Sequence, residues 1–356
     1  MHPRTFALAL LAAGLALIAA TMTANVVLDP QLVFGTPLIR DDENANYRYH
    51  RVRQYQAGRE RFDGLLFASS RGKAFEPNVL ADKMGAHAVA KFDMPTGMMT
   101  DHLPALHYIL RDKAARGETI KAVLLLIDID FFGKLPLTNV NIDSFLPPEL
   151  SGDHPARFWW RYLTVFQFRM WRGIIAHRWR AGGLSGATNP AMPERRRVVV
   201  AGLSASALRI ANPQVGAPDA IPGRGKLLVA TRPQMTAHLD MLRRFASLCR
   251  DNGIKLTVAT TPMRADASSL YHPEDLRDVV ERLSRVVPVW DFTAPDWLAR
   301  NPGFWDDPSH FKPTVGLMML ERMFGNPAAA PAGFGVLQGA LQGAGPAARP
   351  VSQTPL

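Results

Sequence analysis

Five segments of the chain have the hydrophobic pattern of buried β-strands. Most are continuous apolar runs rather than alternating ones, as expected when a strand is covered on both faces. They are residues 64–68, 87–92, 122–129, 254–260 and 287–291. Apolar residues recur at helical spacing in residues 101–116, 233–252 and 274–286. Because strands alternate with helices, the sequence predicts an α/β fold built on a doubly wound, parallel, five-stranded sheet.

The N-terminal stretch has the composition of a membrane anchor. Residues 5–28 contain no charged side chain, and a bilayer core is crossed by about 20 apolar residues in a helix. Arg4 precedes the stretch and Asp29 follows it, so the positive-inside rule places the N-terminus in the cytoplasm and the body outside. A cleaved signal peptide is the alternative, but Ile18 or Met22 would occupy the position that requires a small residue. We therefore expect an uncleaved anchor, and both alternatives export the body.

Three regions follow from this pattern: an anchor over residues 1–28, an α/β body over residues 29–325 and a tail over residues 326–356. The tail is rich in Ala, Gly and Pro and almost uncharged, so we expect it to be disordered. An insertion at about residues 133–230 separates the third strand from the fourth, and it is far longer than a simple crossover requires.

The insertion contains a segment in which aromatic and aliphatic residues fall at helical spacing among arginines. The apolar positions lie within residues 158–180, and the arginines are Arg157, Arg161, Arg169, Arg172, Arg178 and Arg180. Three interpretations stay open: a helix packed on the sheet, a cap over an active site, or a helix lying on the membrane surface.

The net charge of +10, from 41 Lys+Arg against 31 Asp+Glu, invites a nucleic-acid interpretation. The arginines are dispersed or confined to residues 157–197, and no nucleic-acid-binding motif is present, so anionic lipid or polysaccharide is the better partner. A single cysteine, Cys249, rules out an intrachain disulfide and a Cys-based zinc site. It falls on the apolar stripe of a predicted helix, where we expect it to pack.

Candidate catalytic residues follow the first and the last predicted strands of the chain. The first strand runs directly into Ser69-Ser70-Arg71, and Asp307 and His310 follow the last strand on a turn. Open α/β sheets place functional groups at the carboxyl ends of their strands. Serine ester chemistry needs a nucleophile, a base and a group that orients the base. We therefore predict Ser70 as nucleophile, His310 as base and Asp307 as its partner.

Each of these signals is weak alone, because a serine pair is most often a turn and D-x-x-H is most often surface coil.

Other motifs are weaker. Residues 202–206 (GLSAS) half match G-x-S-x-G, and residues 221–226 (IPGRGK) lack the spacing of a phosphate loop. His102 and His107 are five residues apart, whereas a helical metal pair is spaced by four. We expect neither a metal nor a cofactor.

Residues 67–71 (FASSR), taken with residues 307–310 (DPSH), resemble the membrane-anchored bacterial branch of the SGNH (GDSL-like) hydrolase-like proteins, which is related in pattern to envelope acyltransferases. In many members these blocks read G-S-S-R and D-S-S-H. Further matching pieces are Asp29-Pro30, residues 34–37, residues 91–97 (KFDMPTG), Thr261-Pro262 and residues 290–292. The resemblance covers roughly residues 1–325 without the insertion, and it implies an SGNH or flavodoxin-like sheet.

The resemblance implies a triad of Ser70, His310 and Asp307, with the backbone N–H groups of Ser70 and Gly97 forming an oxyanion hole. It also implies an exported, single-pass protein of the bacterial inner membrane that faces the periplasm or the cell exterior. Arg71 and Asp130 are expected beside the substrate. Two positions depart from the family pattern. Ala68 replaces the first-block glycine, and the third strand ends in residues 128–132 (DIDFF) without the Asn that typical members supply to the oxyanion hole.

Three functions stay open at this point. The first is an esterase or O-acyltransferase that acts on a cell-envelope glycan or lipid through an acyl-serine intermediate. The second is a catalytically silent accessory module that binds envelope polysaccharide or a biosynthetic assembly partner. The third is an anchored domain whose arginine-rich insertion docks on anionic lipid.

Overall fold

The computed structural model describes residues 3–35, 45–132, 146–180, 231–293 and 295–339. Its centre is a six-stranded sheet with the order β2-β1-β3-β4-β5-β6. Neighbouring strands from β2 to β5 are parallel, and β6 pairs antiparallel with β5. The strands are β1 (Gly64–Ala68), β2 (Val89–Asp93), β3 (Ala122–Ile127), β4 (Lys255–Thr260), β5 (Val289–Asp291) and β6 (Val336–Gln338).

The strand order reverses at β1, because β2 is added on one side of it and β3 on the other. Such a reversal opens a crevice at the carboxyl ends of the strands, where α/β proteins bind ligands. Ala68 at the end of β1 pairs with Asp93 of β2, and Ile127 at the end of β3 pairs with Thr260 of β4. The segments that follow these four strands therefore meet at one edge of the sheet.

Alternate side chains of the strands enter two hydrophobic cores, one on each face of the sheet. Leu65 and Phe67 of β1 belong to the first core, and Leu66 and Ala68 belong to the second. All four are fully buried. The prediction that the strands are covered on both faces is therefore confirmed.

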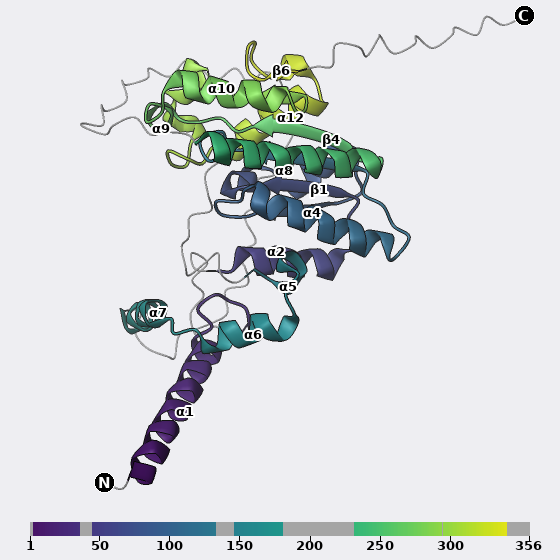
Figure 1. Cartoon of the computed structure of the whole chain (residues 1–356). Helices are drawn as coiled ribbons and strands as arrows, with labels where there is room; N and C mark the ends of the chain where they lie inside the picture. Colours follow the sequence, from purple (N-terminus) through teal and green to yellow (C-terminus); the bar gives the residue numbers. More distant parts are fainter. Residues whose placement is uncertain (1–2, 36–44, 133–145, 181–230, 294, 340–356) are drawn as a thin grey trace, which may run out of the picture.

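Helices cover each core. The first core is covered by α2 (Tyr47–Gly58), α4 (Met99–Ala114), α8 (Arg232–Asp251) and α10 (Pro273–Ser284), which Figure 1 shows one after another in front of the sheet. The second is covered by η2 (Ser70–Ala74), α3 (Pro77–Met84) and α12 (Pro313–Phe324). Short connecting helices are α5 (Pro148–Ser151), α9 (Ala265–Ser268), α11 (Asp296–Ala299), η4 (Pro302–Phe304) and η5 (Pro327–Ala329).

Local sequence explains where the long helices begin and end. In α8, Thr231 and Gln234 form a capping box at the N-terminus, and Gly253 adopts a φ of +67° just beyond the C-terminus. Cys249, near the end of α8, is buried in the first core, as its place on the apolar stripe predicts. Burial raises the pKa of its thiol to about 12, so the side chain packs as an apolar group.

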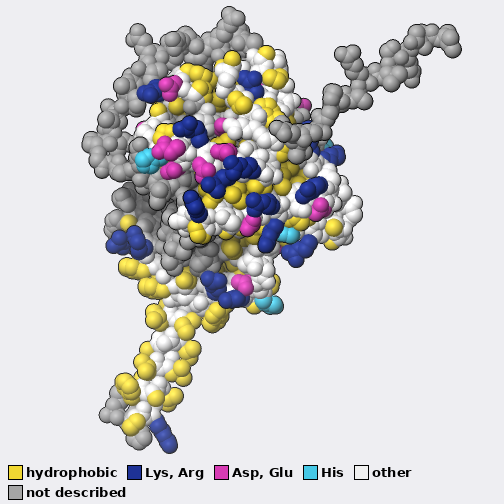
Figure 2. All heavy atoms as spheres, turned by 45° about the horizontal axis from the view of Figure 1, so that its top comes forward, with side chains coloured by type: hydrophobic (Ala, Val, Ile, Leu, Met, Phe, Trp, Pro, Cys, Tyr) yellow, Lys and Arg dark blue, Asp and Glu magenta, His cyan; other side chains and the backbone are white. Residues whose placement is uncertain are grey.

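Helix α1 (Pro3–Leu28) is the one described helix that is long and apolar enough to cross a membrane. Its leucines are exposed over most of its length, and Figure 2 shows them as a hydrophobic stalk projecting from the body. The buried residues of α1 are Thr21 and Asn25, which lie near its C-terminal end.

The predicted helix at residues 158–180 is two helices, α6 (Pro155–Thr164) and α7 (Phe168–Arg180). Both pack against α1 (Figure 1). The interpretation of a helix packed on the sheet is therefore wrong. Phe158 and Tyr162 instead join a separate small core with Val33 and Tyr49. The rest of the insertion, including the motifs at residues 202–206 and 221–226, lies outside the described residues.

The C-terminal region differs from the expectation of a disordered tail from residue 326 onward. The structure describes it through residue 339 and includes β6 as a sixth strand. Phe334 is fully buried and makes an edge contact with Phe292 at a centroid distance of 5.0 Å. One aromatic side chain in a Gly-rich segment thus brings the chain back to the sheet, which the composition of the segment did not predict.

The buried His102 of α4 makes the stability of this fold depend on pH. Its ring lies 5.7 Å from that of Phe67, and burial lowers its pKa from 6.5 to about 4. Between these two pH values the unfolded chain binds a proton that the folded protein does not bind. The contribution of His102 to the free energy of unfolding is therefore fully present above about pH 6.5. It is lost as the pH decreases toward 4, and the loss amounts to about 3 kcal/mol for this group.

We expect His102→Phe to flatten this dependence, because phenylalanine fills the same space and does not titrate. The melting temperature of full-length protein in detergent at pH 7 and pH 4.5 is the measurement. The matched control is His107→Gln, which changes an exposed histidine on the same helix. A pH dependence as steep in His102→Phe as in the wild type would contradict the assignment.

Candidate active site

Ser70 is placed by the end of β1 and the start of η2. Ser69 caps the turn, because its hydroxyl accepts a hydrogen bond from the Arg71 N–H at 3.1 Å. Gly72 lets the turn pack tightly on the sheet, since a Cβ there would lie 2.6 Å from Cβ of Asp93 and 2.7 Å from Cβ of Ala68. Ser70 is thereby held at the edge of the sheet with its side chain half-buried.

The loop that carries Asp307 and His310 is a tight hairpin closed by a bridge between Trp305 and Phe311. Both aromatic residues are buried, and their rings meet edge to face at 6.4 Å. The Asp306 N–H donates to the His310 carbonyl at 2.8 Å. The buried aromatic pair thus fixes the polar tip of the loop above the second core.

The structure brings the three predicted triad residues together. Oγ of Ser70 lies 2.8 Å from Nε2 of His310, and Nδ1 of His310 lies 2.7 Å from Oδ2 of Asp307. These distances are those of a nucleophile, a base and an orienting carboxylate. The residues are 240 positions apart in the chain, so the contact depends on the fold.

Asp307 holds the tautomer of His310. Burial alone would raise the pKa of the Asp307 carboxyl, but the Ser309 N–H and the His310 ring outweigh this effect and lower it. Its Oδ1 accepts the backbone N–H groups of Ser309 and His310 at 2.7 and 3.0 Å, which leaves Oδ2 for the ring. A carboxylate at Nδ1 keeps the proton on that nitrogen, so Nε2 can accept the proton of Ser70.

A buried arginine links the two halves of this site. Nε of Arg71 donates to the Ser309 carbonyl at 2.9 Å. Its two terminal nitrogens donate to the two carboxylate oxygens of Asp130 at 2.9 and 3.1 Å. Arg71 follows the nucleophile in the chain, and Ser309 precedes the base. One guanidinium therefore connects the neighbours of Ser70 and His310 directly.

Two further residues complete the arginine's surroundings. Thr261 accepts a hydrogen bond from Arg71 at 2.9 Å and donates to Asp128 at 2.6 Å, and Asp128 lies 3.3 Å from the guanidinium. Burial alone would lower the pKa of Arg71, but the charges of Asp128 and Asp130 outweigh it and raise that pKa. Asp128 was not among the site residues expected from the sequence. The signal that could have found it is a second carboxylate directly after the same strand.

Arg71 and Asp130, the residues expected beside the substrate, form an ion pair with each other. Both side chains are buried, and their charges face each other. Asp130 occupies the region of the chain where typical SGNH-like proteins supply an Asn, and its carboxylate is neutralised by Arg71. Ala68, the other departure, is an ordinary strand residue whose φ is not positive, so no glycine is required there.

The N–H of Gly97, expected as an oxyanion donor, has an acceptor within the protein. Its N–H donates to the Met94 carbonyl at 2.9 Å and closes a turn in which Thr96 has a φ of +52°. Glycine is required here for space, because a Cβ would lie 2.9 Å from the Ala68 carbonyl oxygen. The Ser70 N–H begins η2 and has no acceptor within that turn, so it remains the available oxyanion donor of the expected pair.

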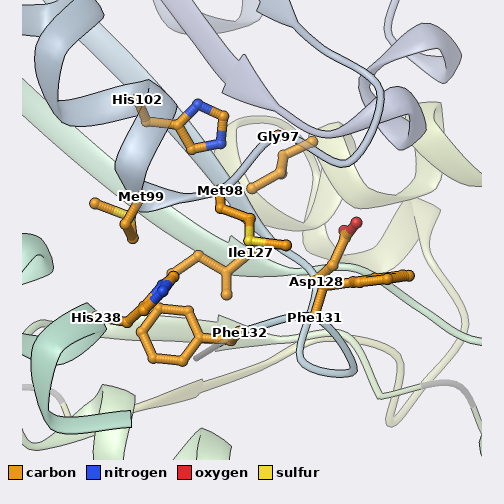
Figure 3. A pocket seen from close by; sticks show the side chains of 10 residues that line it. Gly97, Met98, Met99, His102, Ile127, Asp128, Phe131, Phe132 and His238 are labelled. Carbon is orange, nitrogen blue, oxygen red and sulfur yellow. The ribbon is translucent and has the colours of Figure 1, made fainter. Parts of the chain in front are cut away.

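A small cavity of about 20 Å³ lies between the ends of β2 and β3, bordered by Gly97 and Asp128 (Figure 3). Such a volume holds about one water molecule. Its walls are mainly methionine and phenylalanine side chains with two histidines: Met98, Met99, His102, Leu126, Ile127, Phe131, Phe132 and His238. Within the described ranges, no group of three or more His, Cys, Asp or Glu side chains could hold a metal ion.

Comparison with known proteins adds no family to this picture. No protein-family model matches the chain, and neither does any curated protein.

Replacing Arg71 by methionine is expected to destabilise the protein by about 3–5 kcal/mol, because Asp128 and Asp130 would be left buried without a counter-charge. Adding Asp130→Asn to Arg71→Met should recover part of this loss. The measurement is the free energy of unfolding from urea denaturation in detergent.

Arg250→Met is the matched control, because Arg250 lies on the surface of α8 with 75% of its side chain exposed. This substitution should change the free energy of unfolding by no more than about 0.5 kcal/mol. Equal effects at positions 71 and 250 would show that the buried network does not stabilise the fold.

Proposed function

We propose that the protein is a membrane-anchored, extracytoplasmic serine esterase or O-acyltransferase of the SGNH-like type. The observation that carries this proposal is the continuous hydrogen-bonded chain from Ser70 through His310 to Asp307. The substrate class is an O-acyl ester on a cell-envelope glycan or lipid. A tether at the membrane would keep the site close to the surface where such molecules are assembled.

The geometry supports a two-step acyl transfer. Oγ of Ser70 attacks the acyl carbonyl carbon while Nε2 of His310 takes its proton, and the bond to the leaving alkoxide then breaks. His310 returns the proton to that alkoxide, which leaves an acyl-serine. A water molecule or an acceptor hydroxyl, deprotonated by His310, then attacks the acyl carbon. The bond from this carbon to Oγ of Ser70 breaks, the acyl group leaves on the attacking oxygen, and His310 returns the proton to Oγ.

The charges that develop in both steps are stabilised by groups of the candidate site. The imidazolium formed at His310 is stabilised by the ionised Asp307. The Ser70 N–H at the start of η2 is available to the developing oxyanion, and a donor of this kind contributes about 3 kcal/mol to transition-state stabilisation. Gly97 becomes a second donor if substrate opens the Met94–Gly97 turn.

The anchoring half of the proposal is supported by α1. We infer that it crosses the bacterial inner membrane once, with Arg4 on the cytoplasmic side and the body in the periplasm or outside the cell. The length and apolar surface of the helix support the crossing, and the position of Arg4 supports the direction.

A second candidate is a catalytically silent accessory module that binds envelope polysaccharide or an assembly partner. The specific observation in its favour is the engagement of the Gly97 N–H by the Met94 carbonyl. A site with one oxyanion donor instead of two is weakened by a factor of about 10²–10³.

The enzyme proposal predicts that full-length protein in detergent reacts with a fluorophosphonate probe and hydrolyses p-nitrophenyl acetate. Ser70→Ala should abolish both activities. Asp307→Asn should keep the fold but reduce turnover by ~10⁴, because the amide stabilises the wrong tautomer of His310. Ser269→Ala removes an exposed hydroxyl and should leave both unchanged.

Two results would contradict the enzyme proposal in different ways. Labelling that persists in Ser70→Ala at the wild-type rate would remove Ser70 from the nucleophile role. A wild-type protein that neither reacts nor turns over ester, yet binds envelope polysaccharide equally well with Ser70→Ala and His310→Ala, would favour the accessory module.

A further inference from the structure

The junction between α1 and the body is held by a polar contact at one residue of the anchor. Nδ2 of Asn25 donates to the carbonyls of Tyr162, Leu163 and Val165 at 3.1, 2.9 and 2.9 Å. These carbonyls lie at the C-terminal end of α6, where a helix lacks internal donors. Nε1 of Trp171 on α7 donates to Oδ1 of Asn25 at 3.0 Å. Asn25 therefore caps α6 and fixes both helices to the end of α1.

This junction lies at the depth where an anchored α1 would leave the bilayer. The span from Phe6 to Asn25 is about 30 Å long at 1.5 Å per residue, which equals the thickness of the hydrocarbon core. Thr21 and Asn25 are the buried residues of α1, and both are in its last two turns. Helices α6 and α7, which lie across this end (Figure 1), are thus placed at the lipid–water interface.

The two helices carry large apolar side chains that the protein leaves uncovered. Trp160 of α6 is 61% exposed and Ile175 of α7 is 55% exposed. Phe166 and Phe168, at 63% and 55%, stack on each other at 6.1 Å beside the start of α7. Aromatic residues at a membrane–water boundary are typical interfacial anchors. Figure 2 shows hydrophobic side chains around the base of the stalk.

Exposed arginines accompany these apolar residues. Arg161 lies next to Trp160 on α6, and Arg169 and Arg172 follow Phe168 on α7, all three exposed. In the part of the chain that the structure describes, no acidic side chain forms an ion pair with these three. Arginines at this depth complement the charge of anionic phospholipid headgroups.

We propose that α6 and α7 form an interfacial collar that lies on the outer surface of the membrane crossed by α1 and binds anionic phospholipid there. The proposal rests on the anchoring part of the proposed function and is independent of the chemistry at Ser70. The occupant of the exposed face is the lipid of the same bilayer, because the face continues from the apolar surface of α1. The apolar side chains enter the headgroup region, and the arginines pair with phosphate groups.

The test uses full-length protein in vesicles of phosphatidylcholine with phosphatidylglycerol. Single-cysteine variants on a Cys249→Ala background carry a nitroxide label at Trp160→Cys, Ile175→Cys, Leu11→Cys or Trp297→Cys. Collision rates with oxygen and with a water-soluble nickel chelate report the depth of each label. We expect the label at position 11 in the hydrocarbon, those at 160 and 175 at the interface, and the one at 297 in water.

The labels separate failure of this inference from failure of the anchor. A label at position 11 as accessible to nickel as that at 297 would show that α1 does not cross the bilayer. A buried label at position 11, with labels at 160 and 175 as aqueous as that at 297, would overturn the collar while leaving the anchor intact.

The charge complementarity is tested with spin-labelled lipids. We expect motionally restricted phosphatidylglycerol to be enriched about fivefold over phosphatidylcholine around the wild type, the effect of about one arginine–lipid contact. The triple variant R161Q/R169Q/R172Q should lose this enrichment. The control R243Q/R244Q/R250Q, three exposed positions on α8, should keep it. Unchanged enrichment in the first triple variant would contradict the assignment of anionic lipid.

Discussion

The buried guanidinium of Arg71 is the interaction on which the candidate site depends. A charged group in a protein interior is stable only when it is paired and its donors are satisfied. Asp130 supplies a two-oxygen acceptor, and Thr261 and the Ser309 carbonyl occupy further donors. Moving the loop that carries His310 away from Ser70 would remove one of these acceptors from a fully desolvated donor. The geometry between nucleophile and base is therefore tied to the stability of the fold.

The reversal of strand order explains why such a network can form. Arg71 follows β1, Asp128 and Asp130 follow β3, and Thr261 follows β4. These three strands are neighbours and parallel, so their carboxyl ends lie at one edge. Residues that are distant in the chain thereby contact one another without a long loop.

The secondary structure that depends on local sequence pattern could be predicted from the sequence. The five predicted strands, and the helices predicted over residues 101–116, 233–252 and 274–286, agree with the structure to within two residues at each end, because apolar periodicity and the caps are local properties. Ser70, Asp307 and His310 could be selected because the serine follows the first predicted strand in the chain and the other two follow the last. Their mutual distances required the structure.

What the sequence missed depends on partners that are far away in the chain. Asp130 forms a buried ion pair with Arg71, and no pattern in the sequence near Asp130 indicates this partner. The bond from the Gly97 N–H to Met94 is local, but it depends on the positive φ of Thr96, which a non-glycine residue rarely adopts. The docking of α6 on α1 involves the side-chain amide of Asn25, which lies near the end of a largely apolar helix.

A series of long-range contacts connects α1 to the candidate site. Tyr49 of α2 stacks on Phe158 of α6 at 5.8 Å, and its neighbour Arg48 pairs with Asp101 of α4 through bonds of 2.6 and 3.0 Å. Asp101 also accepts the Met98 N–H at 3.1 Å, one residue after Gly97.

The residues in these contacts are buried, and breaking the Arg48–Asp101 pair would leave two desolvated charged groups without each other. Rigid packing from α1 through α6, α2 and α4 therefore fixes how the edge of the sheet that carries Ser70 is oriented relative to the end of the anchor. Under the proposed function, an acyl ester held at a membrane surface would meet that edge in one orientation. The polar residues within and beside the anchor, rather than its apolar length, determine that orientation.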